Sequence, residues 1–186
     1  MEPEEFLEHF RAAIGEVEQQ YYVGERTFCY ELYHQLRIRT DEAIRNAPAN
    51  LVFHTENTKR VLGRDEAQAM GLAPLRKRRS PDLILHEYGT GDFQIAAVEV
   101  KARGVYWKPF RNDLVKLTEM IEALNFRVAV FLCINRELTS LRRFIIRNRE
   151  RFNNISAQIV IMAKNGADQP LEYTDFGNLH RENDED

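Results

Sequence analysis

Residues 81–101 read PDLILHEYGTGDFQIAAVEVK, and this stretch determines which fold the chain can adopt. Two strand-like apolar runs flank Gly89-Thr90-Gly91-Asp92, a composition typical of a turn. Strand-like runs joined by so few turn residues predict a β-hairpin. If Tyr88 pairs with Phe93 across the turn, the same register sets Asp82 opposite Glu99.

This pairing predicts that three charged side chains lie on one face of the hairpin. Directly opposed residues share a face, with their Cβ atoms about 5 Å apart. Lys101 lies two residues beyond Glu99 and therefore shares that face with Asp82 and Glu99. Val98 and Val100 then point the other way, into the core. A slip of one residue in the register would move Asp82 to the opposite face.

Two carboxylates held so close repel each other unless a cation or a proton lies between them. Oxygen ligands at this spacing suit a hard divalent ion, with Mg²⁺ or Mn²⁺ the natural candidates. A nearby lysine can position an attacking water or hold a phosphate oxygen. These are the parts needed to hydrolyse a phosphodiester. The alternative is an unrelated α/β protein in which Glu99 and Lys101 form a surface pair.

Helical and extended patterns continue from the hairpin in both directions. Upstream, the apolar spacing predicts helices over residues 4–20 and from Thr27 to about Asn46, then a short strand at Leu51–Thr55. Downstream, the expected elements are a helix from Pro109, a buried strand at Val128–Ile134, a helix over about 137–152, a strand over 155–163 and an edge strand over 171–174.

This order of elements predicts an α/β fold in three layers, with a mixed central β-sheet flanked by helices. The strand that ends at Lys101 and the strand that begins at Val128 should be parallel, because a helix connects them. With 186 residues, a single domain is expected. Its core covers about residues 25–164, the helix over 4–20 precedes it, and an acidic tail begins at about residue 176.

Two further features of composition exclude several classes of protein. The longest apolar run, Val128–Ile134, is far shorter than a membrane span, and the acidic N-terminus does not resemble a secretory signal. We therefore expect a cytoplasmic protein with no membrane partner. Cys29 and Cys133 lie in apolar surroundings without CxxC spacing, which predicts buried thiols and neither a disulfide nor a zinc site.

The charge distribution permits contact with a polyanion, and a well-solvated surface is the alternative. Net charge is −3, but residues 20–165 hold 24 bases and 16 acids between two acidic ends. Four consecutive cations precede Pro81 and should lie at the rim of the carboxylate pair, where they could contact nucleic-acid phosphates: Arg76, Lys77, Arg78 and Arg79. The alternatives are a solvated loop and a patch that resembles a nuclear-localisation signal. The histidines show no pairing that suggests zinc or a nucleophile triad.

At this point the chain resembles a known family. Pro81-Asp82, a spacer and then Glu99-Val100-Lys101 are similar to the signature of the PD-(D/E)XK, or restriction-endonuclease-like, nucleases. The order of elements from Thr27 to Ala163 also resembles the core of that superfamily. The resemblance implies that Asp82 and Glu99 bind the metal, with the carbonyl of Val100 as a third ligand. It makes Lys101 the catalytic lysine.

Members of this superfamily often add polar residues from the helices on either side of the motif. Glu31, in the helix before the sheet, matches the place of an additional catalytic carboxylate, although a solvated helix position is the alternative. Lys116, in the helix after the motif, matches the place of a further polar residue and could contact nucleic acid. Asp113, three residues earlier, provides Lys116 with an ordinary surface partner.

The resemblance thus implies a metal-dependent nuclease that uses Mg²⁺ or Mn²⁺ and hydrolyses phosphodiester bonds, with DNA as the expected nucleic-acid substrate. The alternative is a catalytically inactive module of the same fold that binds nucleic acid or a protein partner. A homodimer or a larger protein partner would supply the recognition surface that so small a chain lacks, an inference by analogy with the fold alone.

Overall fold

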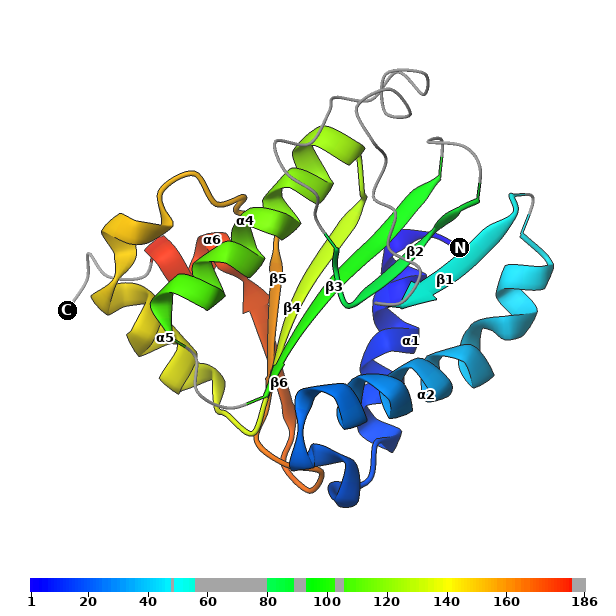
Figure 1. Ribbon diagram of the computed structural model, residues 1–186, viewed down its shortest axis with the longest axis horizontal. Coiled ribbons are helices and arrows are strands. Elements are labelled where there is room, and N and C mark those ends of the chain that lie inside the picture. Colours follow the sequence, from blue (N-terminus) through cyan, green and yellow to red (C-terminus); the bar gives the residue numbers. More distant parts are fainter. Residues whose placement is uncertain (48, 56–79, 89–92, 103–105, 182–186) are drawn as a thin grey trace.

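The computed structural model describes residues 1–47, 49–55, 80–88, 93–102 and 106–181, and they form a six-stranded mixed sheet with helices on both faces (Figure 1). The strands lie side by side in the order of the sequence: β1 (Leu51–Thr55), β2 (Leu83–Glu87), β3 (Gln94–Ala102), β4 (Val128–Ile134), β5 (Val160–Lys164) and β6 (Leu171–Asp175). β1, β2 and β3 are antiparallel, β3, β4 and β5 are parallel, and β6 runs antiparallel at the edge.

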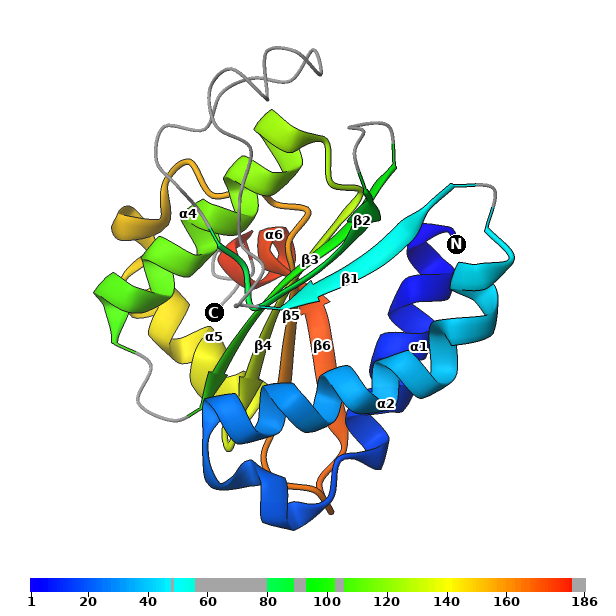
Figure 2. The ribbon, with the colours of Figure 1, turned by 45° about the vertical axis from the view of Figure 1, so that its right-hand side comes forward.

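Helices form the two outer layers. α1 (Pro3–Glu16) and α2 (Glu25–Arg45) cover one face of the sheet, and α4 (Trp107–Leu124), α5 (Leu138–Arg147) and α6 (Phe176–Arg181) cover the other (Figure 2). Two short 3₁₀ helices, η1 (Gln19–Val23) and η3 (Arg149–Phe152), follow α1 and α5. The expected three-layer α/β architecture is confirmed, as is the parallel pairing of β3 with β4.

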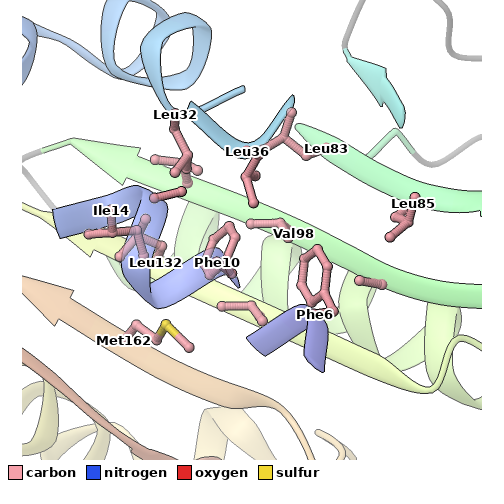
Figure 3. Close-up of a cluster of buried hydrophobic side chains, with 14 of the residues drawn as sticks. Phe6, Phe10, Ile14, Leu32, Leu36, Leu83, Leu85, Val98, Leu132 and Met162 are labelled. Atoms are coloured by element: carbon pink, nitrogen blue, oxygen red, sulfur yellow. The ribbon is translucent and has the colours of Figure 1, made fainter. Parts of the chain in front are cut away.

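The core between the sheet and α1–α2 explains how β3 is oriented (Figure 3). Phe6, Phe10 and Ile14 follow one another at four-residue spacing on α1, so they share one face of the helix, and all three are fully buried. They pack in one cluster with Val98 and Val100 of β3. Because side chains alternate along a strand, Glu99 and Lys101 must face the other layer, which contains α4.

The second core lies between the sheet and the helices α4, α5 and α6. Phe110, Leu114 and Leu117 form the apolar stripe of α4 and pack in one cluster with Phe131 of β4. Every residue of β4 is buried, as its continuous apolar sequence predicts for a strand covered on both faces. This packing fixes α4 directly above the face of β3 that carries the charged residues.

At the end that carries Asp82 and Glu99, the hairpin has the predicted register. Near the turn, its register differs from the prediction. Leu83 pairs with Val98 as expected, but a bulge after Leu85 shifts the pairing by one residue. As a result, the N–H of Glu87, and not that of Tyr88, donates to the carbonyl of Phe93 at 2.9 Å. The predicted pairing of Tyr88 with Phe93 is therefore wrong, while the register that places Asp82 beside Glu99 holds.

Other boundaries also differ from those predicted: α4 begins at Trp107 and not at Pro109, and α5 ends at Arg147 and not near residue 152. The first helix ends at Glu16, where Val17 adopts an extended backbone, and β5 begins only at Val160. The chain does not become a tail at residue 176, because α6 buries Phe176 and Leu179 against the second core. Among the described residues, no helix has the length and apolar composition that would span a membrane.

Candidate functional site

Asp82 lies just before β2 and makes two bonds to β3. Its N–H donates to the carbonyl of Val98 at 2.9 Å, and its carboxylate Oδ2 accepts the N–H of Val100 at 2.7 Å. These two bonds flank Glu99, so Asp82 is held beside it, as the hairpin predicts. In a strand, the N–H and carbonyl of one residue point to the same edge, so the carbonyl of Val100 also points toward Asp82.

Glu99 is buried under α4 and is paired with a lysine from that helix. Only 1% of Glu99 is exposed, and its Oε1 accepts a hydrogen bond from Nζ of Lys116 at 2.6 Å. The same ammonium donates to the carbonyl of Ser80 at 3.1 Å and lies 3.6 Å from Oδ1 of Asp113. The cation that the carboxylate pair requires is therefore supplied by Lys116.

Lys101 connects the two helical layers across the end of β3. Its Nζ lies 3.4 Å from Oε1 of Glu25, at the start of α2, and 3.4 Å from Oδ2 of Asp113 on α4. The end of β3 and the start of α2 lie at the same end of the sheet (Figure 2). We call the resulting group the charged cluster; its members are Glu25, Asp82, Glu99, Lys101, Asp113 and Lys116.

The environment of the charged cluster shifts the pKa values of two members in the same direction. Burial, with help from the nearby carboxylates Asp82 and Asp113, raises the pKa of Glu99 well above its usual value, although Lys116 opposes this. Burial lowers the pKa of Lys101, but four surrounding carboxylates outweigh that effect and raise it overall. Lys101 therefore carries its charge at neutral pH and acts as a fixed cation.

The donor set of the charged cluster fits a hard divalent ion in its chemistry. Mg²⁺ is commonly held by one or two carboxylates, with waters and substrate oxygens completing its shell. Asp82 and Glu99 supply two carboxylates, and the carbonyl of Val100 lies on the same edge of β3. Within the ranges that the structure describes, no group of three His, Cys, Asp or Glu side chains is arranged to hold an ion. Lys116 occupies Oε1 of Glu99, so an ion would have to displace it.

Glu31, another predicted site residue, is not part of the charged cluster. Glu31 accepts a hydrogen bond from Nε2 of Gln35 at 2.7 Å within α2, and its exposure is intermediate. The carboxylate of α2 that reaches Lys101 is Glu25, about 9 Å away along the helix axis. The run Arg76–Arg79 lies outside the described residues, so its contact with phosphates stays a prediction.

Asp113 and Glu25 were not predicted as site residues. The interpretation of Asp113 as a surface partner of Lys116 is wrong, because Asp113 is only 8% exposed. A signal for it exists in the sequence: Asp113 lies within the apolar stripe of α4, between Phe110 and Leu114. A charged residue in such a stripe needs a buried partner. Glu25 offers no comparable signal.

The structure also pairs two histidines, a contact that the sequence interpretation did not identify. Nε2 of His86 and Nδ1 of His54 lie 3.0 Å apart on the neighbouring strands β2 and β1. Burial and the neighbouring His54 lower the pKa of His86 to about 4, so the pair is neutral at physiological pH. A neutral pair shares one hydrogen bond, with one ring nitrogen donating and the other accepting.

A cavity of about 190 Å³ opens beside Asp82, between the first turns of α2 and the adjoining ends of β1 and β2. Two members of the charged cluster, Asp82 and Glu25, form part of its wall. Its other lining residues are Arg26, Cys29, Tyr30, Thr55 and Leu83. Asp82 and Glu25 thus line a cavity on the side of the sheet that α2 covers, whereas Glu99 lies under α4 on the other side.

Comparison with known proteins finds no family model, no curated protein and no solved structure that matches this chain.

Proposed function

We propose that this chain is a metal-dependent nuclease with a restriction-endonuclease-like core, and that it hydrolyses phosphodiester bonds in DNA. The observation that carries the proposal is the charged cluster itself. Each buried charge costs several kcal/mol of desolvation, and apolar residues of similar volume would often give a more stable protein. Perturbed pKa values in a group of buried charges beside a cavity are typical of functional sites.

The order of the elements around the charged cluster supports the same proposal. α2 is followed by three antiparallel strands, β1 to β3, then by α4 and by β4, which is parallel to β3. A helix, three meandering strands, a crossover helix and a further strand make up the core that the sequence resemblance implies. The motif residues Asp82, Glu99 and Lys101 lie together at one end of this core.

In this proposal Asp82, Glu99 and the carbonyl of Val100 hold one Mg²⁺ or Mn²⁺ ion. The ion would supply a Lewis acid that polarises the phosphate and makes water a stronger nucleophile at neutral pH. Lys101 keeps its proton and stabilises the negative charge that develops on the phosphate. Glu25 and Asp113 hold the ammonium of Lys101 in place, as their 3.4 Å contacts indicate. Glu31 has no part in this mechanism, because its contact is with Gln35.

The proposal is tested by incubating the purified protein with single-stranded, double-stranded and branched DNA and with RNA, in chelator and in Mn²⁺. We expect cleavage that depends on Mn²⁺ and is lost in Lys101→Ala. Lys108→Ala, which removes an exposed lysine from the first turn of α4, is the matched control. Cleavage that persists in chelator, or that Lys101→Ala leaves unchanged, would contradict the assigned chemistry.

A second function is favoured by one contact. Because Lys116 already neutralises the neighbourhood of Glu99, the same fold could serve as a module that binds nucleic acid or a protein and carries out no chemistry. In that case Lys116→Met would strongly destabilise the protein, and Mn²⁺ would raise the melting temperature of neither the wild type nor the variant. A rise with Mn²⁺ in the wild type favours the nuclease.

A further inference from the structure

The cavity beside Asp82 has the features of a binding site for one nucleotide. Its position ties it to the charged cluster, because Asp82 lines it directly and Glu25 lines it while contacting Lys101 at 3.4 Å. Its volume of about 190 Å³ is roughly six times the share of one water in the liquid. A space of this size can take a single ring system.

Two side chains at the cavity are available to a ligand. Tyr30 is 54% exposed, and Arg26 is also exposed. They lie four residues apart on α2, so they project from the same face of the helix, and both line the cavity. Arg26 has no ion pair with any residue that the structure describes, although two carboxylates line the same cavity. A guanidinium beside an exposed aromatic ring is a combination that proteins commonly use to bind a nucleotide, because the ring stacks on the base and the guanidinium binds the phosphate.

The charges of the cavity decide which part of a nucleotide enters it. Because Asp82 belongs to the proposed metal site, Glu25 is the carboxylate on the wall that can accept a hydrogen bond from an amino group on the edge of adenine, cytosine or guanine, and its charge disfavours a phosphate there. The base therefore occupies the cavity and its phosphate meets Arg26 at the mouth. Only a base that is not paired within a duplex can do this.

We infer that the cavity holds one unpaired nucleotide next to the scissile phosphate, with its base stacked on Tyr30 and its phosphate bound by Arg26. This inference rests on the proposed nuclease function and defines its substrate: nucleic acid with an unpaired base at the point of cleavage. Stacking on an aromatic side chain is sequence-tolerant, because every base presents a flat face. The site would therefore select structure and not sequence.

The test measures binding in chelator, so that no cleavage occurs, by fluorescence anisotropy with three DNA probes: a single strand, a full duplex and a duplex with one unpaired 2-aminopurine. We expect the wild type to bind the unpaired probe more tightly than the full duplex. Tyr30→Ala should weaken that binding about five- to 150-fold, and Tyr30→Phe should retain it. For the single strand, Arg26→Ala should reduce the slope of the logarithm of the binding constant against the logarithm of the salt concentration by about 0.7.

Two exposed residues further along α2 provide matched controls. Ile38→Ala removes an exposed apolar side chain, and Arg45→Ala removes an exposed cation. Both should bind all three probes as the wild type does. Quenching of 2-aminopurine fluorescence on binding, lost in Tyr30→Ala and kept in Ile38→Ala, would report stacking on Tyr30 directly.

The possible outcomes separate this inference from the proposed function. Equal binding of paired and unpaired probes by the wild type, or unchanged binding by Tyr30→Ala, would overturn the nucleotide site. If Mn²⁺-dependent cleavage of the duplex persisted in either case, the nuclease proposal would survive. Absence of binding to any probe by the wild type, together with absence of cleavage, would overturn both.

Discussion

Nζ of Lys116 lies 2.6 Å from Oε1 of Glu99, so a lysine from α4 supplies the cation that the carboxylates of the β2–β3 hairpin require. The contact is almost completely buried, with 1% of the Glu99 side chain and 17% of the Lys116 side chain exposed. In such surroundings a charge–charge interaction is screened far less than at the surface. If the chain binds a divalent ion as proposed, Lys116 and that ion would therefore compete for the same carboxylate.

Replacing Lys116 with methionine should increase the affinity for Mn²⁺. The variant keeps an unbranched apolar side chain under the sheet but removes the competing ammonium, so Glu99 becomes available to the ion. Two charges about 4 Å apart near a protein surface interact by roughly 4 kcal/mol before relaxation, so a gain of about tenfold in affinity is a conservative expectation. Calorimetric titration with Mn²⁺ at pH 8 measures it.

The control for this titration is Lys108→Met, which removes an exposed lysine from the same helix. It should bind Mn²⁺ as the wild type does. Weaker binding by Lys116→Met than by Lys108→Met would mean that Lys116 supports the metal site and does not compete with it.

Lys101→Ala should reduce Mn²⁺-dependent cleavage by about 10²- to 10³-fold, the usual cost of losing one group that stabilises charge in the transition state. The fold should persist, because Lys101 faces the charged cluster and not an apolar core. The melting temperature should fall modestly, since Glu25 and Asp113 lose the ammonium between them. Single-turnover cleavage and circular dichroism of Lys101→Ala and Lys108→Ala provide the comparison. Cleavage by Lys101→Ala at the rate of the wild type would refute the catalytic role of Lys101.

The fold could be predicted from the sequence because its signals are local and mutually consistent. Leu51–Thr55 and Val128–Ile134 are strands with the bounds that their apolar runs predict. The hairpin could be predicted because so few residues join its two strands. The bulge beside Leu85 could not be predicted, since it leaves Ile95 of β3 without a partner on β2, and the apolar run over residues 95–98 is compatible with either register.

The charged cluster could be predicted only in part, because half of its members come from other elements. The hairpin register alone brings Asp82, Glu99 and Lys101 together. Periodicity identifies the buried face of α2, but not which of its turns meets the end of β3, and so it does not distinguish Glu25 from Glu31. The pairing of His54 with His86 depends on the register of β1 with β2, which a long connection leaves undetermined.

Two substitutions of Asp82 should separate its structural role from its role toward metal. Asp82→Asn keeps an oxygen that accepts the N–H of Val100 and removes the repulsion of Glu99, so without metal it should be as stable as the wild type or more so. Asp82→Ala leaves that N–H without its acceptor and should lose about 1–3 kcal/mol. Urea denaturation in chelator measures both.

The same proteins report metal binding when the melts are repeated in Mn²⁺. If the wild type binds Mn²⁺ as proposed, an ion at a hundredfold its dissociation constant should stabilise it by about 2.7 kcal/mol. Asp82→Asn lacks one ligand and should gain much less. A variant that is strongly destabilised in chelator, yet shifts with Mn²⁺ as far as the wild type, would show that Asp82 is structural and binds no ion.

The histidine pair should make the protein sensitive to acid. The pKa of His86 is about 4 in the folded protein, against 6.5 as its ordinary value, because it is buried beside His54. The unfolded chain binds the proton more readily in this interval, so stability is complete above pH 6.5 and is lost as the pH falls toward 4. The loss is on the order of 3 kcal/mol.

Comparison with His86→Gln isolates this contribution from that of the carboxylates, which titrate in the same range. Relative to His86→Gln, the unfolding free energy of the wild type should decrease between pH 6.5 and 4. His34→Gln, at an exposed position of α2, should show no such difference. If the unfolding free energies of the wild type and His86→Gln changed with pH in parallel, the lowered pKa of His86 would be contradicted.

The ionisation of Glu99 should give the opposite pH dependence of stability, at higher pH than the histidine pair. Because burial raises its pKa in the folded protein well above 4.5, the native state binds the proton more readily than the unfolded chain as the pH rises above that value. The stability from this proton is complete below pH 4.5 and is lost as the pH rises through the raised pKa. Glu99→Gln keeps an oxygen for Lys116 and cannot ionise, so its advantage over the wild type in chelator should widen with rising pH. Urea denaturation at intervals from pH 5 to 9 measures the difference, and a gap that stays constant would show that Glu99 and Lys116 form a stable ion pair throughout.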